Sequence, residues 1–400
     1  MTTSPFSYAT PWVDGTRASH ASAARRTLGA LTRVVTFDAL TGALAARPLG
    51  RVTHVLPAPD GSHVVVQGAD AAWIFDMNGA HIGSIPRSTG DGLTFVTSGG
   101  VFRNLEEHDW KGDRATHEIF LPIGRAGRVW ATYVNGTTAV VVNQQAIEGN
   151  HASRTPEQIV VVANHLVAGS LADKLIGASV LPATWGMGAI TRKGEAVVLT
   201  TGGDLHVYAH EANDELSLKQ LHASHVPLAG YDVSIVNGAL AVLVAAGVPN
   251  VDDAEWHGPY QGATDLFTRF DQLGGAHWKT HLHLVSLTGT VGAPLAVPFE
   301  VLQPPVDGGG GRIYLAGNGF AAVQDGKLLW SQAPTARTLV AAFAGGEVAL
   351  TIGKELRIVE RDGHIGQTFA TAGEAITTPP AIAPDGSVWL ATEKAIYAAR

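Results

Sequence analysis

Residues 51–85 read RVTHVLPAPDGSHVVVQGADAAWIFDMNGAHIGSI and contain four short runs that are rich in β-branched and aromatic residues. Pro-Asp-Gly, Gly-Ala-Asp and Asn-Gly stand between the runs. Asp-Gly and Asn-Gly supply the positive φ angles that tight hairpin turns require. The stretch therefore predicts a four-stranded antiparallel meander.

The same pattern returns in the C-terminal third of the chain. Residues 311–332, 338–369 and 375–399 each contain strand-like runs with the same turn residues between them. Four strands in about 40 residues is the period of a propeller blade. The turn between the first two strands of each unit lies at Asp60-Gly61, Gly99-Gly100, Asn135-Gly136, Lys193-Gly194, Asn237-Gly238, Gly309-Gly310, Gly345-Gly346 and Asp385-Gly386. The sequence thus predicts an all-β chain that folds as one β-propeller of eight blades, or of seven, because the unit at residues 92–123 is irregular.

The two ends of the chain complement each other. The last unit stops at Arg400 one strand short, whereas residues 33–49 supply strand-like runs without a unit of their own. Pairing them would remove two unpaired strand edges, which are prone to aggregate. We expect the N-terminal strand to close the ring, with residues 1–32 as an N-terminal tail and residues 33–400 as the propeller.

Several hairpins between third and fourth strands share one form. They read VVTFDALTGALAAR at 34–47, WIFDMNGAHIGSI at 73–85, LHLVSLTGTVGAPL at 282–295 and AAVQDGKLLWSQ at 321–332. They resemble the quinoprotein-type propeller repeat (PQQ-like repeat), in which a strand ending in Asp precedes a Thr-Gly or Asp-Gly turn and a strand ending in Trp. That family includes pyrroloquinoline-quinone dehydrogenases and a non-catalytic outer-membrane assembly lipoprotein, both eight-bladed. The resemblance implies the fold and a likeness to the non-catalytic members, because the terminal Trp is present only at Trp330 and the cysteine pair of many quinone sites cannot exist here.

Composition excludes several classes of function. The chain has 400 residues, a formal net charge of −8 and no stripe of Lys and Arg, so a nucleic-acid partner is not expected. No segment approaches the roughly 18 apolar residues of a membrane span, and the N-terminus lacks the apolar core of a secretory signal. We therefore expect a cytoplasmic protein. There are no cysteines, which excludes disulfides, cysteine nucleophiles and thiolate zinc sites.

Three connections are longer than the rest: residues 103–117, 143–158 and 247–280. We expect each to join the second and third strands of its unit, and hence to emerge on one face of the propeller. Long loops on a rigid scaffold often carry binding residues. A binding face for a protein partner is therefore expected at Trp110, His151, Trp256, His257, Tyr260, Phe267 and Trp278. One alternative is that the insertions are tolerated surface loops. Another is that the aromatic rings fold back and pin their own loop to the edge of the blade.

Histidines are the candidate metal ligands. On a strand, His281 and His283 point to the same side, so the two imidazoles could share a divalent ion, with Asp252, Asp253 or Glu255 completing the ligand set. The alternative is that they are ordinary polar strand positions. No other cofactor is expected.

No nucleophile elbow, phosphate-binding loop or dinucleotide fingerprint occurs, so no catalytic residue is assigned. Two hypotheses follow. The first is a non-catalytic propeller scaffold that binds a protein partner through its long-loop face. The second is a propeller enzyme, a metal-assisted hydrolase or a lactonase-like protein, with a divalent ion near the central channel. The oligomeric state stays open.

Overall fold

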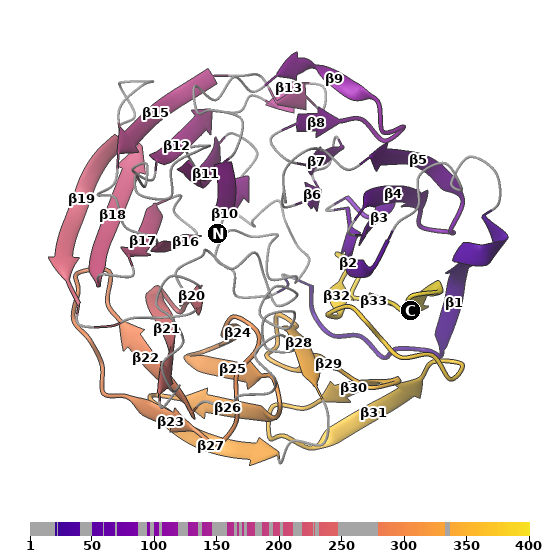
Figure 1. Ribbon diagram of the computed structural model, residues 1–400. Helices are drawn as coiled ribbons and strands as arrows, with labels where there is room; N and C mark the ends of the chain where they lie inside the picture. The colour runs from indigo at the N-terminus through magenta and orange to yellow at the C-terminus, as the bar shows by residue number, and fades with distance from the viewer. Residues whose placement is uncertain are drawn as a thin grey trace.

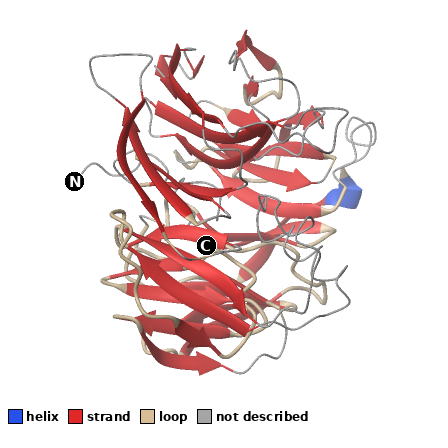
Figure 2. Cartoon of the chain, turned by 60° about the vertical axis from the view of Figure 1, so that its left-hand side comes forward, coloured by secondary structure: helices blue, strands red, loops and turns tan. Residues whose placement is uncertain are grey.

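The computed structural model describes residues 21, 23–40, 50–58, 60–68, 70–86, 94–96, 100–103, 106–118, 127–134, 138–145, 158–163, 166–167, 170–171, 174–180, 186–191, 195–200, 203–210, 218–226, 228, 232–246, 279–332 and 337–400. These residues are mostly strands, and their only helix is the short 3-10 helix η1 (Phe37–Ala39), blue in Figure 2. Within these ranges no helix has the length and apolar character needed to cross a membrane.

The first four sheets are each four-stranded and antiparallel. The first sheet consists of β2 (Val52–Pro57), β3 (His63–Gly68), β4 (Ala71–Asp76) and β5 (His81–Pro86). The second consists of β6 (Thr94–Val96), β7 (Val101–Arg103), β8 (Glu106–His108) and β9 (Arg114–Glu118). The third consists of β10 (Gly127–Val134), β11 (Thr138–Gln145), β12 (Gln158–Ala163) and β15 (Lys174–Val180), with a small hairpin of β13 (Leu166–Val167) and β14 (Ser170–Leu171) between the last two. The fourth consists of β16 (Gly186–Ile190), β17 (Ala196–Thr200), β18 (Asp204–His210) and β19 (Leu218–His225).

Four further sheets follow the same plan. The fifth consists of β20 (Asp232–Val236), β21 (Ala239–Ala246), β22 (Lys279–Val285) and β23 (Leu295–Val297). The sixth consists of β24 (Val306–Gly309), β25 (Arg312–Ala316), β26 (Phe320–Gln324) and β27 (Lys327–Gln332). The seventh consists of β28 (Thr338–Ala342), β29 (Val348–Ile352), β30 (Glu355–Val359) and β31 (Ile365–Ala370). The eighth consists of β32 (Ala381–Ile382), β33 (Val388–Ala391), β34 (Ala395–Ala399) and β1 (Leu31–Thr36).

The sheets stand around a central axis, as Figure 1 shows, each with its first strand innermost and its last strand outermost. The innermost strands of neighbouring sheets contact each other, as in the series β10, β16, β20, β24, β28, β32 and β2. Radial repetition of four-stranded antiparallel sheets is the architecture of a β-propeller. The chain is therefore an all-β propeller.

Turn chemistry explains why the sequence forms these hairpins. Asn237 and Gly238 have φ angles of 50° and 76°, which the two central residues of a type I′ hairpin turn require. Gly61 and Gly386, which follow Asp in the corresponding turns of the first and eighth sheets, have φ angles of 69° and 83°. In these three turns the glycine that predicted the hairpin thus adopts the positive φ that the prediction needed.

The expectation that residues 103–117 form a second-to-third connection is wrong. This range contains β8 and most of β9, the third and fourth strands of the second sheet. Asp109 Oδ1 accepts hydrogen bonds from the backbone N–H groups of Lys111 (2.8 Å) and Asp113 (3.0 Å), and so closes the β8–β9 turn. Asp76 closes the β4–β5 turn in the same way. The sequence does not reveal these two strands because β8 (EEH) and β9 (RATHE) are short and polar.

The other two long connections lie where the sequence predicts. Residues 146–157 join β11 to β12, and residues 247–278 join β21 to β22. Ala246 lies directly opposite Lys279, and Asn143 lies opposite Gln158, so each connection starts and ends on paired strands. The connecting residues themselves lie outside the described ranges.

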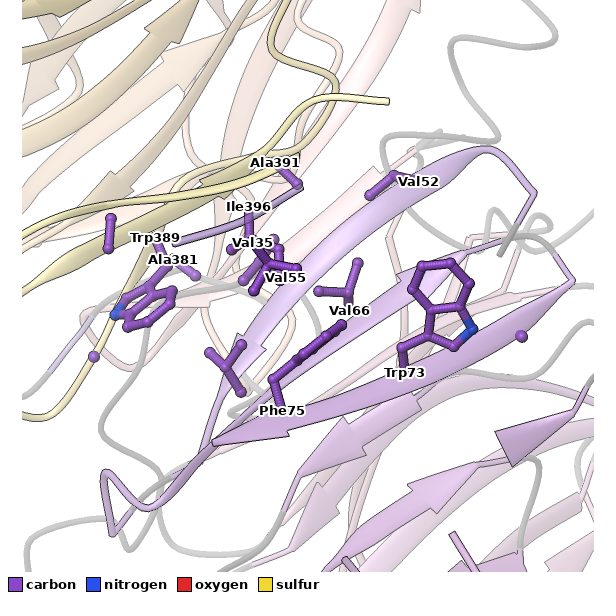
Figure 3. Packing of buried hydrophobic residues seen from close by; sticks show 14 residues of the cluster. Val35, Val52, Val55, Val66, Trp73, Phe75, Ala381, Trp389, Ala391 and Ile396 are labelled. Carbon is purple, nitrogen blue, oxygen red and sulfur yellow. The ribbon is translucent and has the colours of Figure 1, made fainter. Parts of the chain in front are cut away.

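The two ends of the chain meet in the eighth sheet. β1 pairs with β34 from Leu31 opposite Ala399 to Thr36 opposite Ala395. Figure 3 shows apolar side chains from this sheet, such as Trp389 and Ile396, packed beside Val55 and Phe75 of the first sheet. Residues 41–49 of the expected N-terminal strand region lie outside the described ranges.

The residues before β1 form a strap across the seventh and eighth sheets. We call residues 21 and 23–30 the N-terminal strap. Ala21 donates its N–H to Ala342 O at 2.8 Å, and Gly29 donates to Arg400 O at 2.6 Å. Leu28 is 3% exposed and packs with apolar residues of both sheets. Part of the expected tail is therefore built into the propeller.

Candidate functional site

Trp110 does not lie with the long second-to-third connections. It sits in the β8–β9 turn, and its ring stacks on the imidazole of His63, with centroids 4.0 Å apart and planes 8° apart. His63 begins β3, directly after the first turn of the first sheet. In an antiparallel meander the first and third turns lie at one end of the strands. The connection between the second and third strands lies at the other end. Trp110 therefore lies at the opposite ends of the strands from Gln145 and Ala246, the residues after which the two long connections begin.

The remaining residues of the expected binding face lie outside the described ranges. They are His151, Trp256, His257, Tyr260, Phe267 and Trp278. Asp252, the expected acidic metal ligand, lies outside them as well. Their roles stay predictions.

His281 and His283 lie on β22, the strand that follows the longest connection. His281 is opposite Val244, and His283 is opposite Val242. Cross-strand neighbours share one face of a sheet. Val242 is buried among residues of the fourth sheet, such as Leu205 and Val207, and Val244 packs against this cluster. The two imidazoles therefore face the fourth sheet, and both are half-buried.

Two polar residues of the fourth sheet, His222 and Ser224, face the fifth sheet. His222 is opposite Val207 and Ser224 is opposite Leu205, so both side chains point toward the fifth sheet. His222 Nε2 and Ser224 Oγ are buried and have no hydrogen-bond partner. Sequence reasoning missed this pair, although the alternation in LHASH, residues 221–225, places His222 and Ser224 on one strand face.

The third-to-fourth turn of the fifth sheet covers these two side chains. A methyl group added at Gly289, in the β22–β23 turn, would lie 2.2 Å from Ser224 Oγ and 3.6 Å from His222 Nε2. The hydroxyl and the imidazole are not hydrogen-bonded to each other. They therefore do not form the nucleophile and base pair of a serine hydrolase in this arrangement.

Burial governs the electrostatics of the fifth-sheet histidines. The pKa of His283 lies below the ordinary imidazole value, chiefly because burial disfavours the charged ring. A hydrogen bond to the backbone of Gly292 raises this pKa, and the neighbouring His281 lowers it. The Nδ1 atom of His283 is buried without a partner. The ring thus carries one buried nitrogen without a partner.

A separate buried imidazole lies on the innermost strand of the first sheet. His54 is 5% exposed, and neither ring nitrogen has a hydrogen-bond partner. Burial lowers its pKa from 6.5 to about 4, so the ring is neutral at pH 7. No sequence signal set this histidine apart from its apolar neighbours in RVTHVLP.

Comparisons with known proteins concern the fold. No protein-family model matches the sequence, and no curated protein matches it either. A computationally designed protein, Ika8, is similar in structure with a TM-score of 0.58, 10% identity, and coverage of 92% of this chain and 99% of that one. A streptogramin B lyase has a TM-score of 0.43 at 14% identity, covering 88% of this chain and 94% of that one. The WD40 β-propeller domain of Doa1 has a TM-score of 0.46 at 12% identity, covering 94% and 97%.

At these identities the similarities describe the fold and no activity. The resemblance to the quinoprotein-type repeat is not tested by them and stays a prediction.

Proposed function

We propose that this chain is an eight-bladed propeller, closed by β1, that binds a protein partner through the edge where its second and third strands are joined. The eight four-stranded sheets and the pairing of β1 with β34 support the architecture. We call the side of the propeller on which the second strands end, marked by Gln145 and Ala246, the long-loop edge.

The observation that carries the proposal is the common origin of the two longest connections. Both join second to third strands, and in a ring of similarly oriented antiparallel sheets such connections leave from the same edge. Residues held by a rigid scaffold at one edge can act together on one partner.

Sequence content favours recognition over simple linkage. Trp256, Tyr260 and Phe267 lie in the longer connection. Aromatic residues, Trp and Tyr above all, are enriched among those that contribute most to the free energy of protein–protein binding. The connection is anchored at both ends in the sheet, because Ala246 and Lys279 are cross-strand neighbours. We infer that a loop of this composition, anchored in this way, binds a protein partner.

The test removes the connection and keeps the sheet. Because Ala246 lies opposite Lys279, an Asn-Gly pair can replace residues 247–278 as a two-residue hairpin turn. The partner is first isolated with the intact chain, and its affinity for each purified variant is then measured by calorimetry. We expect the replacement to weaken binding at least 100-fold while cooperative unfolding is retained.

A second variant serves as the matched control for chain length. It keeps the full connection and changes Trp256, Tyr260 and Phe267 to Ser. A large loss of affinity in this variant assigns recognition to the aromatic side chains. Unchanged affinity in the loop replacement would overturn the proposal.

A further inference from the structure

We propose that His281 and His283 form a chelating site for a divalent transition-metal ion that favours imidazole ligands, such as Zn²⁺, Cu²⁺ or Ni²⁺. The proposal concerns this pair of side chains alone and does not depend on a protein partner.

Strand geometry brings the two rings together. Alternate residues of a β-strand point to the same face, and their Cα atoms are about 6.5–7 Å apart. That separation lets two imidazoles converge on one ion. Both rings lie on the face turned toward the fourth sheet, and both side chains are half-buried.

One ring nitrogen of the pair is shown to be available for coordination. His283 Nδ1 is buried and has no hydrogen-bond partner. A metal-ligating histidine usually donates its other ring N–H to a carbonyl or carboxylate, which fixes its tautomer and orientation. The buried, unpartnered Nδ1 atom makes His283 the leading candidate ligand of the pair.

The ligand count sets the kind of site. The described part of the chain contains no group of three or more His, Cys, Asp or Glu side chains placed to hold one ion. We therefore assign two protein ligands, with water filling the other positions. Such a site exchanges its ion more readily than a four-ligand structural zinc site. Among divalent ions Cu²⁺ should bind most tightly, following the usual order of affinities.

The test titrates the purified full-length chain with Cu²⁺ and follows binding by calorimetry and electron paramagnetic resonance. His281→Ala, His283→Ala and the double variant are compared with His364→Ala, whose ring lies 65% exposed in a third-to-fourth turn. We expect each single variant to weaken one site at least tenfold. The double variant should bind one equivalent less and lose the nitrogen hyperfine splitting of that site, whereas His364→Ala should keep it.

Two controls separate loss of the metal site from loss of the fold. Each variant must retain the cooperative unfolding transition of the wild-type chain. His283→Gln preserves a polar side chain near Gly292 without an imidazole and should lose the site as fully as His283→Ala. A double variant that binds the same number of Cu²⁺ ions with the same spectrum as the wild-type chain would overturn the proposal.

Discussion

Gly363 lies against the indole ring of Trp330, so that a methyl group added to the glycine would sit 2.8 Å from the ring. Gly363 belongs to the third-to-fourth turn of the seventh sheet, and Trp330 lies on the outermost strand of the sixth. Gly79, Gly112 and Gly289 meet the preceding sheet in the same way, all with positive φ. Each of these turns therefore docks onto its neighbour through a glycine that has room for no side chain.

Gly363→Ala should destabilise the chain more than Gly353→Ala. Both glycines have positive φ, at 93° and 59°, so both substitutions cost roughly 1–2 kcal/mol of left-handed strain. Gly353 has no atom within 4 Å of an added methyl group. Overpacking against Trp330 should add about 1–3 kcal/mol at Gly363. Equal losses of unfolding free energy in urea titrations would show that the contact between the two sheets is unimportant.

Leu28→Ala tests the N-terminal strap. Leu28 is 3% exposed between the seventh and eighth sheets, whereas Leu221 is 47% exposed on β19. Removing the buried side chain should cost about 2–4 kcal/mol of unfolding free energy, and Leu221→Ala should cost less than about 0.5 kcal/mol. If Leu28→Ala were as mild as Leu221→Ala in chemical denaturation, the strap would not be a stabilising part of the fold.

His54→Leu should flatten the dependence of stability on pH. The unfolded ring has a pKa near 6.5, and burial lowers the folded value to about 4, so folding favours the neutral form. The resulting contribution is fully present above pH 6.5 and is lost as the pH falls toward 4. It amounts to ~3 kcal/mol at most. The comparison is made by urea unfolding at several pH values between 7.5 and 4.

The neighbouring Thr53→Ser is the control, because it changes no titrating group. Other histidines, among them His63, His81, His206 and His283, also have pKa values lowered chiefly by burial. They contribute with the same sign in both proteins, so the difference between His54→Leu and wild type isolates one ring. Identical slopes in the two proteins would mean that His54 is solvated in solution.

Trp110→Ala should weaken folding and leave partner binding unchanged. The ring stacks on His63 between the first and second sheets, on the edge opposite to the long-loop edge. Loss of the stack should cost about 1–2 kcal/mol. A double-mutant cycle with His63→Ala should show that the two substitutions are not additive. Reduced affinity for the partner in Trp110→Ala would place Trp110 at the interface after all.

The repeat was predictable because turn residues and strand periodicity agree. Asp60-Gly61 and Asn237-Gly238 mark first turns whose backbone angles only a few residue types tolerate, and the apolar runs after them are buried strands. Pairing of the chain ends could be anticipated from an eighth unit that lacked one strand. Local signals of this kind depend on backbone sterics and need no knowledge of tertiary contacts.

The candidate site was only partly predictable. Alternation on a strand placed His281 and His283 on one face, but it cannot identify what they face, because that depends on how two sheets pack. The inter-sheet position of His222 and Ser224 follows from that packing alone. The position of Trp110 is not evident from the sequence, because β6, β7 and β8 have three residues each, too few to show a period of two. The similarity of DWKGD at residues 109–113 to DMNGA at residues 76–80 is the signal that indicates this turn.

The most direct test of the central claim is a contact measurement on the long-loop edge. A photo-crosslinking phenylalanine analogue is placed at position 256, within the longest connection, and in a second protein at position 362, where Asp362 is 73% exposed in a third-to-fourth turn on the opposite edge. Each protein is irradiated with the purified partner, and the crosslinked peptide is identified by mass spectrometry. The account predicts a crosslink to the partner from position 256 and none from position 362. A crosslink from position 362 with none from position 256 would contradict it.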